Sequence, residues 1–427
     1  MRILLVHNLY GSTAPSGENQ VFEDEKAMLD RHGVTVDVFT RHSDEIRGAK
    51  VKEEGEGGQW TCRFLSRAQK LYGLIKGAVC TVANPFAAWA LKKKIREFSP
   101  DVVHFHNTFP LISPLAIRTA KKSGAKVVMT LHNYRMVCAA GVPMRNGKVC
   151  RECFAASEQS NNRTIRTILP AICHRCYRGS LLATVPLALN IWLYRKCWMK
   201  WVDKFIVLSE FQKRIMIECG LPADKVVVKG NFVTIPKRTI DLSDNASSRS
   251  GMVFVGRLSD EKGLRTVIDA WRLLGTEAPN LTVVGGGDSR VTYEALAAGL
   301  TIRFVGKKTH EEVMDIFSRA QFIIQPSLCW ETFGLTVIEA ASCRTPAIVS
   351  DIGTLPELVK DGETGVVFRA GDAEDLARVV RKMRNTPDWE KMSSAALAES
   401  KRYSESSNCS VLMDLYLDLK EPERREC

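Results

Sequence analysis

Two acidic and two basic side chains in the second half of the chain have the types and spacing that could bind a phosphorylated sugar. Glu331 and Glu339 lie eight residues apart near the predicted start of a helix, where unpaired backbone N–H groups attract phosphate and hydroxyl oxygens. Arg257 and Lys262 follow a predicted strand, and their charges could stabilise a departing phosphate group. Each feature is common on ordinary protein surfaces when it occurs alone, so the flanking residues must decide its meaning.

Four cysteines in two Cys-x2-Cys pairs form a second group of candidate ligands, and nineteen residues separate the pairs. The four are Cys150, Cys153, Cys173 and Cys176. This spacing is within the range of zinc ribbons, in which four thiolates surround one structural ion. An iron–sulfur centre, a redox pair and unliganded thiols stay open as alternatives, and Cys138 and His174 are spare ligands.

The elements that must position these groups alternate between strands and helices. Apolar runs such as 2–8 and 102–107 are followed by helical patterns, and a second series of this kind begins at residue 251. The alternation is typical of doubly wound parallel sheets, which bind ligands beyond the carboxyl ends of their strands. The length of 427 residues favours two domains. We therefore expect an α/β chain with a first domain at 1–235, which contains a cysteine-rich insertion at about 138–180. A linker at 236–250 should lead to a second domain at 251–385. A helical tail at 386–427 should pack back on the first domain.

Charge is distributed unevenly between the two halves. Residues 1–235 hold 35 Lys and Arg against 19 Asp and Glu, and residues 236–427 hold 25 against 29, so the net charges are +16 and −4 within the total of +12. A basic half indicates contact with phosphate, nucleic acid or an anionic membrane. No apolar run reaches the roughly 18 residues that cross a bilayer, and the first residues resemble a strand more than a signal peptide. We expect a cytoplasmic protein.

The sequence around Glu331 resembles the carboxyl-domain signature of retaining, family-four glycosyltransferases, also called glycosyl transferases group 1, which have the GT-B fold. A Pro-Ser pair at 326–327 precedes an E-x7-E pattern that encloses Phe-Gly, and the matching residues are Glu331, Phe333, Gly334, Glu339 and Ala340. Upstream, FVGRLSDEKG places Arg257 and Lys262 at the paired basic positions of the family. Arg344 is a departure, because the family commonly has glycine before Thr-Pro.

The resemblance implies two domains facing a cleft and a metal-independent transfer that retains the anomeric configuration. In keeping with that, the sequence has no Asp-x-Asp triplet to hold Mg2+. The implied catalytic residues are His132, Arg257, Lys262 and Glu331. The implied donor-binding residues are Ser16, Gly17, Gly256, Phe333, Gly334 and Glu339, and the acceptor-side candidates are His106 and Asn107. We expect His104 to point to the opposite face as a hydrogen-bonded core histidine.

The sequence therefore predicts a hexosyltransferase that moves a sugar from a UDP- or GDP-sugar to a glycan or lipid-linked acceptor in polysaccharide or glycoconjugate synthesis. It predicts no catalytic metal and no nucleic-acid partner, with structural zinc at the four cysteines. Apolar stretches with Trp, Lys and Arg at 86–98 and 180–205 suit the inner face of an anionic membrane or a buried helix. A basic zinc-ribbon nucleic-acid binder would explain the charge and the cysteines, but it would leave Glu331 and Glu339 without a role.

Overall fold

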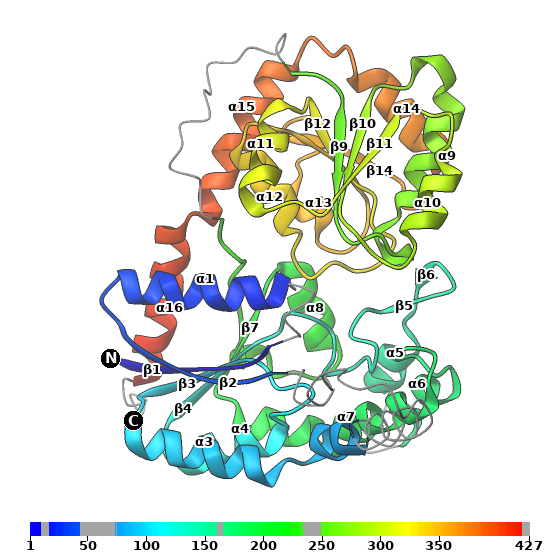
Figure 1. Cartoon of the computed structure of the whole chain (residues 1–427). Coiled ribbons are helices and arrows are strands. Elements are labelled where there is room, and N and C mark those ends of the chain that lie inside the picture. Colours follow the sequence, from blue (N-terminus) through cyan, green and yellow to red (C-terminus); the bar gives the residue numbers. More distant parts are fainter. Residues whose placement is uncertain (10–16, 43–72, 74, 160–164, 234–248, 421–427) are drawn as a thin grey trace, which may run out of the picture.

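The computed structural model describes residues 1–9, 17–42, 73, 75–159, 165–233 and 249–420 of the chain. These residues form two six-stranded parallel sheets, each covered by helices on both faces (Figure 1). The expected two-domain α/β architecture is therefore confirmed. Ser16 and most of the predicted linker at 236–250 lie outside the described residues.

The first sheet has the strand order β2-β1-β3-β4-β7-β8. Its strands are β1 (Arg2–Leu9), β2 (Thr35–His42), β3 (Val102–Asn107), β4 (Lys126–Thr130), β7 (Lys204–Val207) and β8 (Val226–Val228). Its helices are α1 (Gly17–Arg31), α3 (Pro85–Phe98), α4 (Pro114–Lys122), α7 (Leu181–Trp201) and α8 (Glu210–Glu218). All six residues of β3 are buried, as expected for a parallel strand covered by helices on both faces.

The segment between β4 and α7 carries the cysteine pairs and has little regular structure. It contains the short hairpin β5 (Met144–Arg145) and β6 (Lys148–Val149), followed by α5 (Glu152–Gln159) and α6 (Leu169–Cys173). Figure 1 shows this segment beside the lower end of the second domain.

The second sheet has the order β11-β10-β9-β12-β13-β14. Its strands are β9 (Met252–Val255), β10 (Leu281–Val284), β11 (Ile302–Gly306), β12 (Phe322–Gln325), β13 (Ala347–Ser350) and β14 (Gly365–Phe368). Its helices are α9 (Leu264–Leu274), α10 (Arg290–Leu296), α11 (His310–Arg319), α12 (Leu335–Ser342), α13 (Leu355–Leu358), α14 (Ala373–Met383) and α15 (Trp389–Ser400). Because β9 and β12 are neighbours, the loops that follow them meet at one sheet edge.

The end of the chain crosses between the two sheets. α15 contributes Trp389 and Met392 to an apolar cluster of the second sheet. α16 (Glu405–Lys420) instead packs Leu412, Leu415 and Tyr416 against the first sheet, beside α1 (Figure 1). Within the described part of the chain, no helix combines the length and the apolar character that a membrane crossing requires.

Candidate functional site

The loops after β9 and β12 bring a lysine and a glutamate into direct contact at the edge of the second sheet. Lys262 Nζ donates to Glu331 Oε1 at 2.6 Å, and Ser327 Oγ donates to the same oxygen at 2.6 Å. Gly263 has φ +72, and a Cβ there would stand 1.8 Å from the Pro326 carbonyl oxygen. Only glycine therefore lets the two loops approach closely enough to form the ion pair.

The pair is charged at neutral pH. Burial alone would raise the pKa of Glu331, but the Lys262 ammonium and the hydrogen bonds to the carboxylate hold that pKa below its ordinary value. Burial alone would lower the pKa of Lys262, and Glu331 more than reverses this effect. Arg257 stands next to the pair, with its side chain 64% exposed and its guanidinium 3.3 Å from Glu261. The edge therefore presents two cations, each with a carboxylate partner, and the Arg257 side chain is the more exposed of the two.

Glu339 lies on α12, two turns beyond the loop that carries Glu331. Its carboxylate is 3.5 Å from His310 Nδ1, and its side chain is 14% exposed. Burial raises its pKa, while the His310 charge acts in the opposite direction. Asp24 of α1 in the first domain acts electrostatically on both groups, so the two domains face each other here.

The remaining donor-side candidates contribute backbone geometry more than side chains. Gly334 has φ +119 at the start of α12 and has leucine side chains 2.9 and 3.2 Å from the position of a Cβ. Phe333 is buried, and its ring packs against Gly230 and Tyr403. A Cβ on Gly285 would stand 1.9 Å from the carbonyl oxygen of Gly256. The turns that carry these two residues can therefore pack this closely only with glycine at position 285. Gly17 begins α1.

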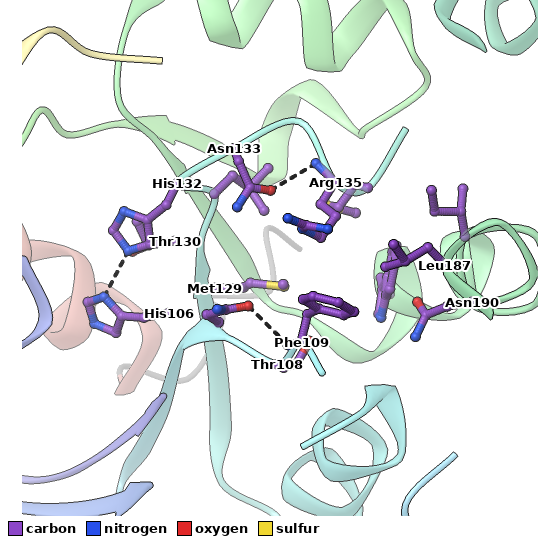
Figure 2. A pocket seen from close by; sticks show the side chains of 15 residues that line it. His106, Thr108, Phe109, Met129, Thr130, His132, Asn133, Arg135, Leu187 and Asn190 are labelled. Atoms are coloured by element: carbon purple, nitrogen blue, oxygen red, sulfur yellow. Dashed lines mark hydrogen bonds between the residues drawn. The ribbon is translucent and has the colours of Figure 1, made fainter. Parts of the chain in front are cut away.

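At the edge of the first sheet, two histidines line a cavity of about 60 Å³. Figure 2 shows His106 and His132 side by side, joined by a 3.0 Å hydrogen bond between His106 Nδ1 and His132 Nε2. Asn107 also lines this cavity, and its side-chain oxygen accepts from the Phe109 N–H at 2.9 Å. Arg135 stacks over the Phe109 ring at 4.5 Å in the same cavity. This cavity has the polar groups that a hydroxylated ligand requires.

Behind the two histidines lies a buried carboxylate that the sequence analysis did not single out. Glu25 of α1 is 1% exposed, and its Oε1 is 3.1 Å from both His104 Nδ1 and His106 Nε2. Its Oε2 accepts a 3.1 Å hydrogen bond from Lys229 Nζ. A continuous series of contacts therefore runs from Lys229 through Glu25 and His106 to His132.

This buried cluster holds one full ion pair, and burial favours the neutral form of His104 and His132. Burial opposes ionisation of Glu25, but Lys229 and the nearby imidazoles hold its pKa well below the ordinary value. Burial, assisted by His106, lowers the pKa of His104 to about 4 and that of His132 well below 6.5. Glu25, His104 and His106 together have the ligand types of a metal site. Because the Lys229 ammonium already neutralises Glu25, we assign the cationic role there to lysine.

The expectation that His104 points to the opposite face is wrong. His104 and His106 are two residues apart in β3 and therefore share one face, with ring centroids 4.4 Å apart. His104 is fully buried, and its ring nitrogens contact Tyr416 Oη and Thr130 Oγ1, both at 2.7 Å. It is a hydrogen-bonded core residue on the same side as the site.

The two sheet edges are linked directly at the site. Thr332 Oγ1 donates to the His132 carbonyl oxygen at 3.0 Å, one residue away from Glu331. Trp330 is 9% exposed and belongs to the apolar cluster of the first sheet, where it packs against Tyr134 and Phe154. The loop that carries Glu331 is therefore anchored in the first domain beside His132.

The predicted metal ligands do not all converge. Cys150, Cys153 and Cys176 line one small cavity together with Cys138. Cys173 is exposed and does not line that cavity.

Sequence reasoning missed Glu25, Lys229, His310 and Trp330. For Glu25 a signal exists, because it stands on the buried stripe of α1 with Val21, Phe22, Met28 and Leu29. A carboxylate on an apolar helix face requires a buried partner. No comparable local signal distinguishes Lys229, whose partners are 179 and 204 residues away in the sequence.

Comparisons with known proteins agree on one family. Residues 16–235 match the family described as Glycosyltransferase Family 4, and residues 243–399 match the one described as Glycosyl transferases group 1. The glycogen synthase of Mycobacterium tuberculosis is 32% identical over 332 residues, which cover 72% of this chain and 69% of that protein. The D-inositol 3-phosphate glycosyltransferase of Corynebacterium aurimucosum is 30% identical over 189 residues, or 41% of this chain and 45% of that protein.

Solved structures share the fold over nearly the whole chain. Sucrose-phosphate synthase from Thermosynechococcus elongatus has a TM-score of 0.63 at 18% identity and covers 98% of each chain. Anabaena HepE, solved with UDP and glucose, has a TM-score of 0.62 at 16% identity and covers 98% of this chain and all of HepE.

Proposed function

The chain belongs to the family-four glycosyltransferases with the GT-B fold, and on that premise we propose that it transfers a hexose from a UDP- or GDP-sugar to a glycan or lipid-linked acceptor. In this proposal the anomeric configuration is retained, no catalytic metal takes part, and the product belongs to polysaccharide or glycoconjugate synthesis. The observation that supports it most strongly is the Lys262–Glu331 ion pair at the cleft, next to the loop that contacts His132.

The cations of the second sheet are suited to the leaving group. Cleavage of the bond between the sugar and the diphosphate leaves negative charge on phosphate oxygens, and fixed positive groups stabilise that charge. Lys262 is held by Glu331 at 2.6 Å, and Arg257 is open to solvent beside it. We assign both to the diphosphate, and Glu339 to hydroxyl groups of the donor.

The histidines of the first sheet are suited to the transferred sugar. We assign the proton between the two rings to His132 Nε2, so that His106 Nδ1 accepts it, while His106 Nε2 lies 3.1 Å from Glu25 Oε1. His132 Nδ1 then carries no proton and can only accept a hydrogen bond, for example from a sugar hydroxyl. Both nitrogens of His106 face groups of the protein, His132 and Glu25, so we assign His106 to orienting His132 and place the acceptor near Asn107 and Arg135.

A panel of donors tests this function. Purified full-length protein should release nucleoside diphosphate from one UDP- or GDP-sugar, and the rate should rise with a suitable glycan or lipid-linked acceptor and persist with a metal chelator. NMR of the product should show the anomeric configuration of the donor. Absence of nucleoside diphosphate release from every donor would contradict the proposal, and an inverted product would contradict retention.

We also propose association with the cytoplasmic face of an anionic membrane. In α3, Phe86 is 80% exposed and Trp89 is 69% exposed, and Lys92 to Lys94 follow them. In α7, which hydrogen-bonds to Thr81 just before α3, Leu182 is 80% exposed. Apolar side chains next to cations are typical of interfacial helices. Sedimentation with anionic vesicles should exceed sedimentation with neutral vesicles and should fall with salt, whereas equal binding to both would contradict an anionic surface.

A further inference from the structure

The segment between β4 and α7 folds four cysteines around one small cavity. These are Cys138, Cys150, Cys153 and Cys176, and the cavity they line has a volume of about 20 Å³. One water-sized probe occupies about 10–15 Å³, so the cavity has room for a single ion. We propose that these four thiols bind one structural zinc ion, with Cys138 in the place that the sequence spacing gave to Cys173.

The choice of Cys138 over Cys173 rests on where the chain places each thiol. Cys173 is the last residue of α6, is exposed and does not line the cavity. The chain then turns sharply at Arg175, which has φ +49, and Cys176 returns to the cavity. Cys138 reaches the same cavity from the loop after β4, four residues beyond the buried Tyr134. Regular Cys-x2-Cys spacing in the second pair is therefore misleading.

Backbone groups surround two of the sulfurs. Cys138 Sγ lies 3.8 Å from the Val142 carbonyl oxygen, backbone hydrogen bonds of Ala140 and Gly141 reach Cys138, and one of Ala171 reaches Cys153. Such N–H donors are the outer contacts that orient and stabilise metal ligands.

The proposed binding step is balanced in protons and charge. Each of the four thiols releases one proton, and four thiolates with one Zn2+ leave a net charge of −2 at the site. Arg145 also lines the cavity, where its guanidinium pairs with Glu152. His174 lines it too, but its Nε2 is 3.1 Å from Glu152, so it already has a carboxylate partner. Four sulfur ligands fill a tetrahedral site and leave no position for catalysis.

The site would support the domain contact near the cleft. Cys153 is next to Phe154, whose ring packs against Trp330 at 5.4 Å. The Arg151 guanidinium also contacts this residue, 5.4 Å from the centroid of the Trp330 ring. Zinc would therefore fix the segment on which the Glu331 loop rests.

X-ray absorption of the zinc-loaded full chain tests the ligand set without depending on a destabilised variant. Protein expressed with zinc and purified without chelators should contain about one zinc per chain, with four sulfurs at about 2.3 Å. The Cys173→Ser variant should keep the same zinc content and the same four sulfurs. Wild-type protein without zinc, with iron in its place, or with fewer than four sulfur ligands would overturn the proposal.

The matched variant is Cys138→Ser. Its zinc content should fall several-fold or more below that of Cys173→Ser when both proteins are purified in parallel. Loss of zinc or of one sulfur in Cys173→Ser, with retention in Cys138→Ser, would overturn the assignment in favour of the two regular pairs. Because Cys173→Ser alone distinguishes the two sets, the test remains decisive if Cys138→Ser fails to fold.

Discussion

The two sheet edges meet where Thr332 contacts His132, and they differ in how far their charged side chains are exposed. At the first sheet, Glu25 and Lys229 are buried at 1% and 5% exposure and lie behind His106 and the neutral His132, which line the cavity. At the second sheet, Lys262 and Glu331 keep 21% and 16% of their side chains exposed, and Arg257 keeps 64%. One edge uses charge internally to orient neutral groups, whereas the other offers charge to a ligand.

The difference fits two halves of one reaction. A diphosphate leaving group needs cations that it can reach, because the stabilising charge must contact the phosphate oxygens. A sugar hydroxyl needs a hydrogen-bond acceptor of fixed orientation, which a neutral imidazole held by a buried carboxylate provides. Each of the following variants changes a side chain at one of the two edges, and they are given from the largest expected effect to the smallest.

Removal of the buried carboxylate should have the largest effect. Glu25→Ala leaves Lys229 buried without its 3.1 Å partner, and loss of one member of such a pair costs about 3–5 kcal/mol of unfolding free energy. Chemical denaturation measures this loss. Glu23→Ala, on the exposed side of the same helix, is the control and should change stability little. A Glu25→Ala variant as stable as this control would show that the buried pair is not a structural requirement.

Removal of the lysine at the second edge should affect turnover and leave folding largely intact. Lys262→Ala should lower kcat by about 10²-fold or more, the scale of one fixed charge-stabilising group. Lys308→Ala, which removes an exposed lysine paired with Glu312, is the control. Unchanged turnover in a folded Lys262→Ala protein would remove this residue from the leaving-group site. Arg257→Ala should show a loss of the same order.

Acid should destabilise the first edge through its neutral histidines. His7 of β1 is fully buried, and its ring centroid lies 6.2 Å from that of His106. Burial, with a contribution from His106, lowers the pKa of His7 to about 3. Below pH 6.5 the unfolded chain takes up a proton at this position and the folded chain does not, so stability falls as the pH falls. One such histidine contributes at most about 1.4 kcal/mol per pH unit between pH 6 and 4. His7→Gln should therefore reduce the slope of unfolding free energy against pH by about this amount, and an unchanged slope would contradict the assignment of neutral His7.

The smallest effect should come from the carboxylate on α12. Glu339→Gln keeps the shape of the side chain and weakens hydrogen bonds to donor hydroxyls by about 1 kcal/mol, which corresponds to roughly 5-fold in affinity. The KM for the donor should rise by this factor while kcat changes little, because the contact is equal in the ground and transition states. Steady-state kinetics separates the two. A change in kcat alone would place Glu339 in the chemical step.

The sequence supports prediction of the elements better than prediction of their contacts. Apolar runs and helical periodicity identify both βα series, and the motif around Glu331 identifies the second edge. Glu25 is overlooked because a glutamate in a helix is ordinary until its partners His104, His106 and Lys229 are known from other elements. The error about His104 has a simpler cause, since residues two apart in a strand share a face.

The cysteines give a second example of contacts that the sequence does not predict. Regular spacing selects Cys173, but spacing cannot show on which side of a short helix a thiol emerges. The turn at Arg175 and the return of the loop after β4 bring Cys138 to the cavity in its place. The insertion of Trp330 into the first domain likewise depends on the packing of two domains, which local sequence does not encode.

The assignment of the diphosphate to the second sheet can be tested directly by calorimetric titration of UDP and of GDP into three full-length proteins. These are the wild type, Lys262→Ala and His132→Asn. One of the two nucleotides should bind the wild type, bind Lys262→Ala at least about 10-fold more weakly, and bind His132→Asn with unchanged affinity. Equal weakening in both variants, or weakening in His132→Asn alone, would contradict the assignment of the diphosphate to the second sheet.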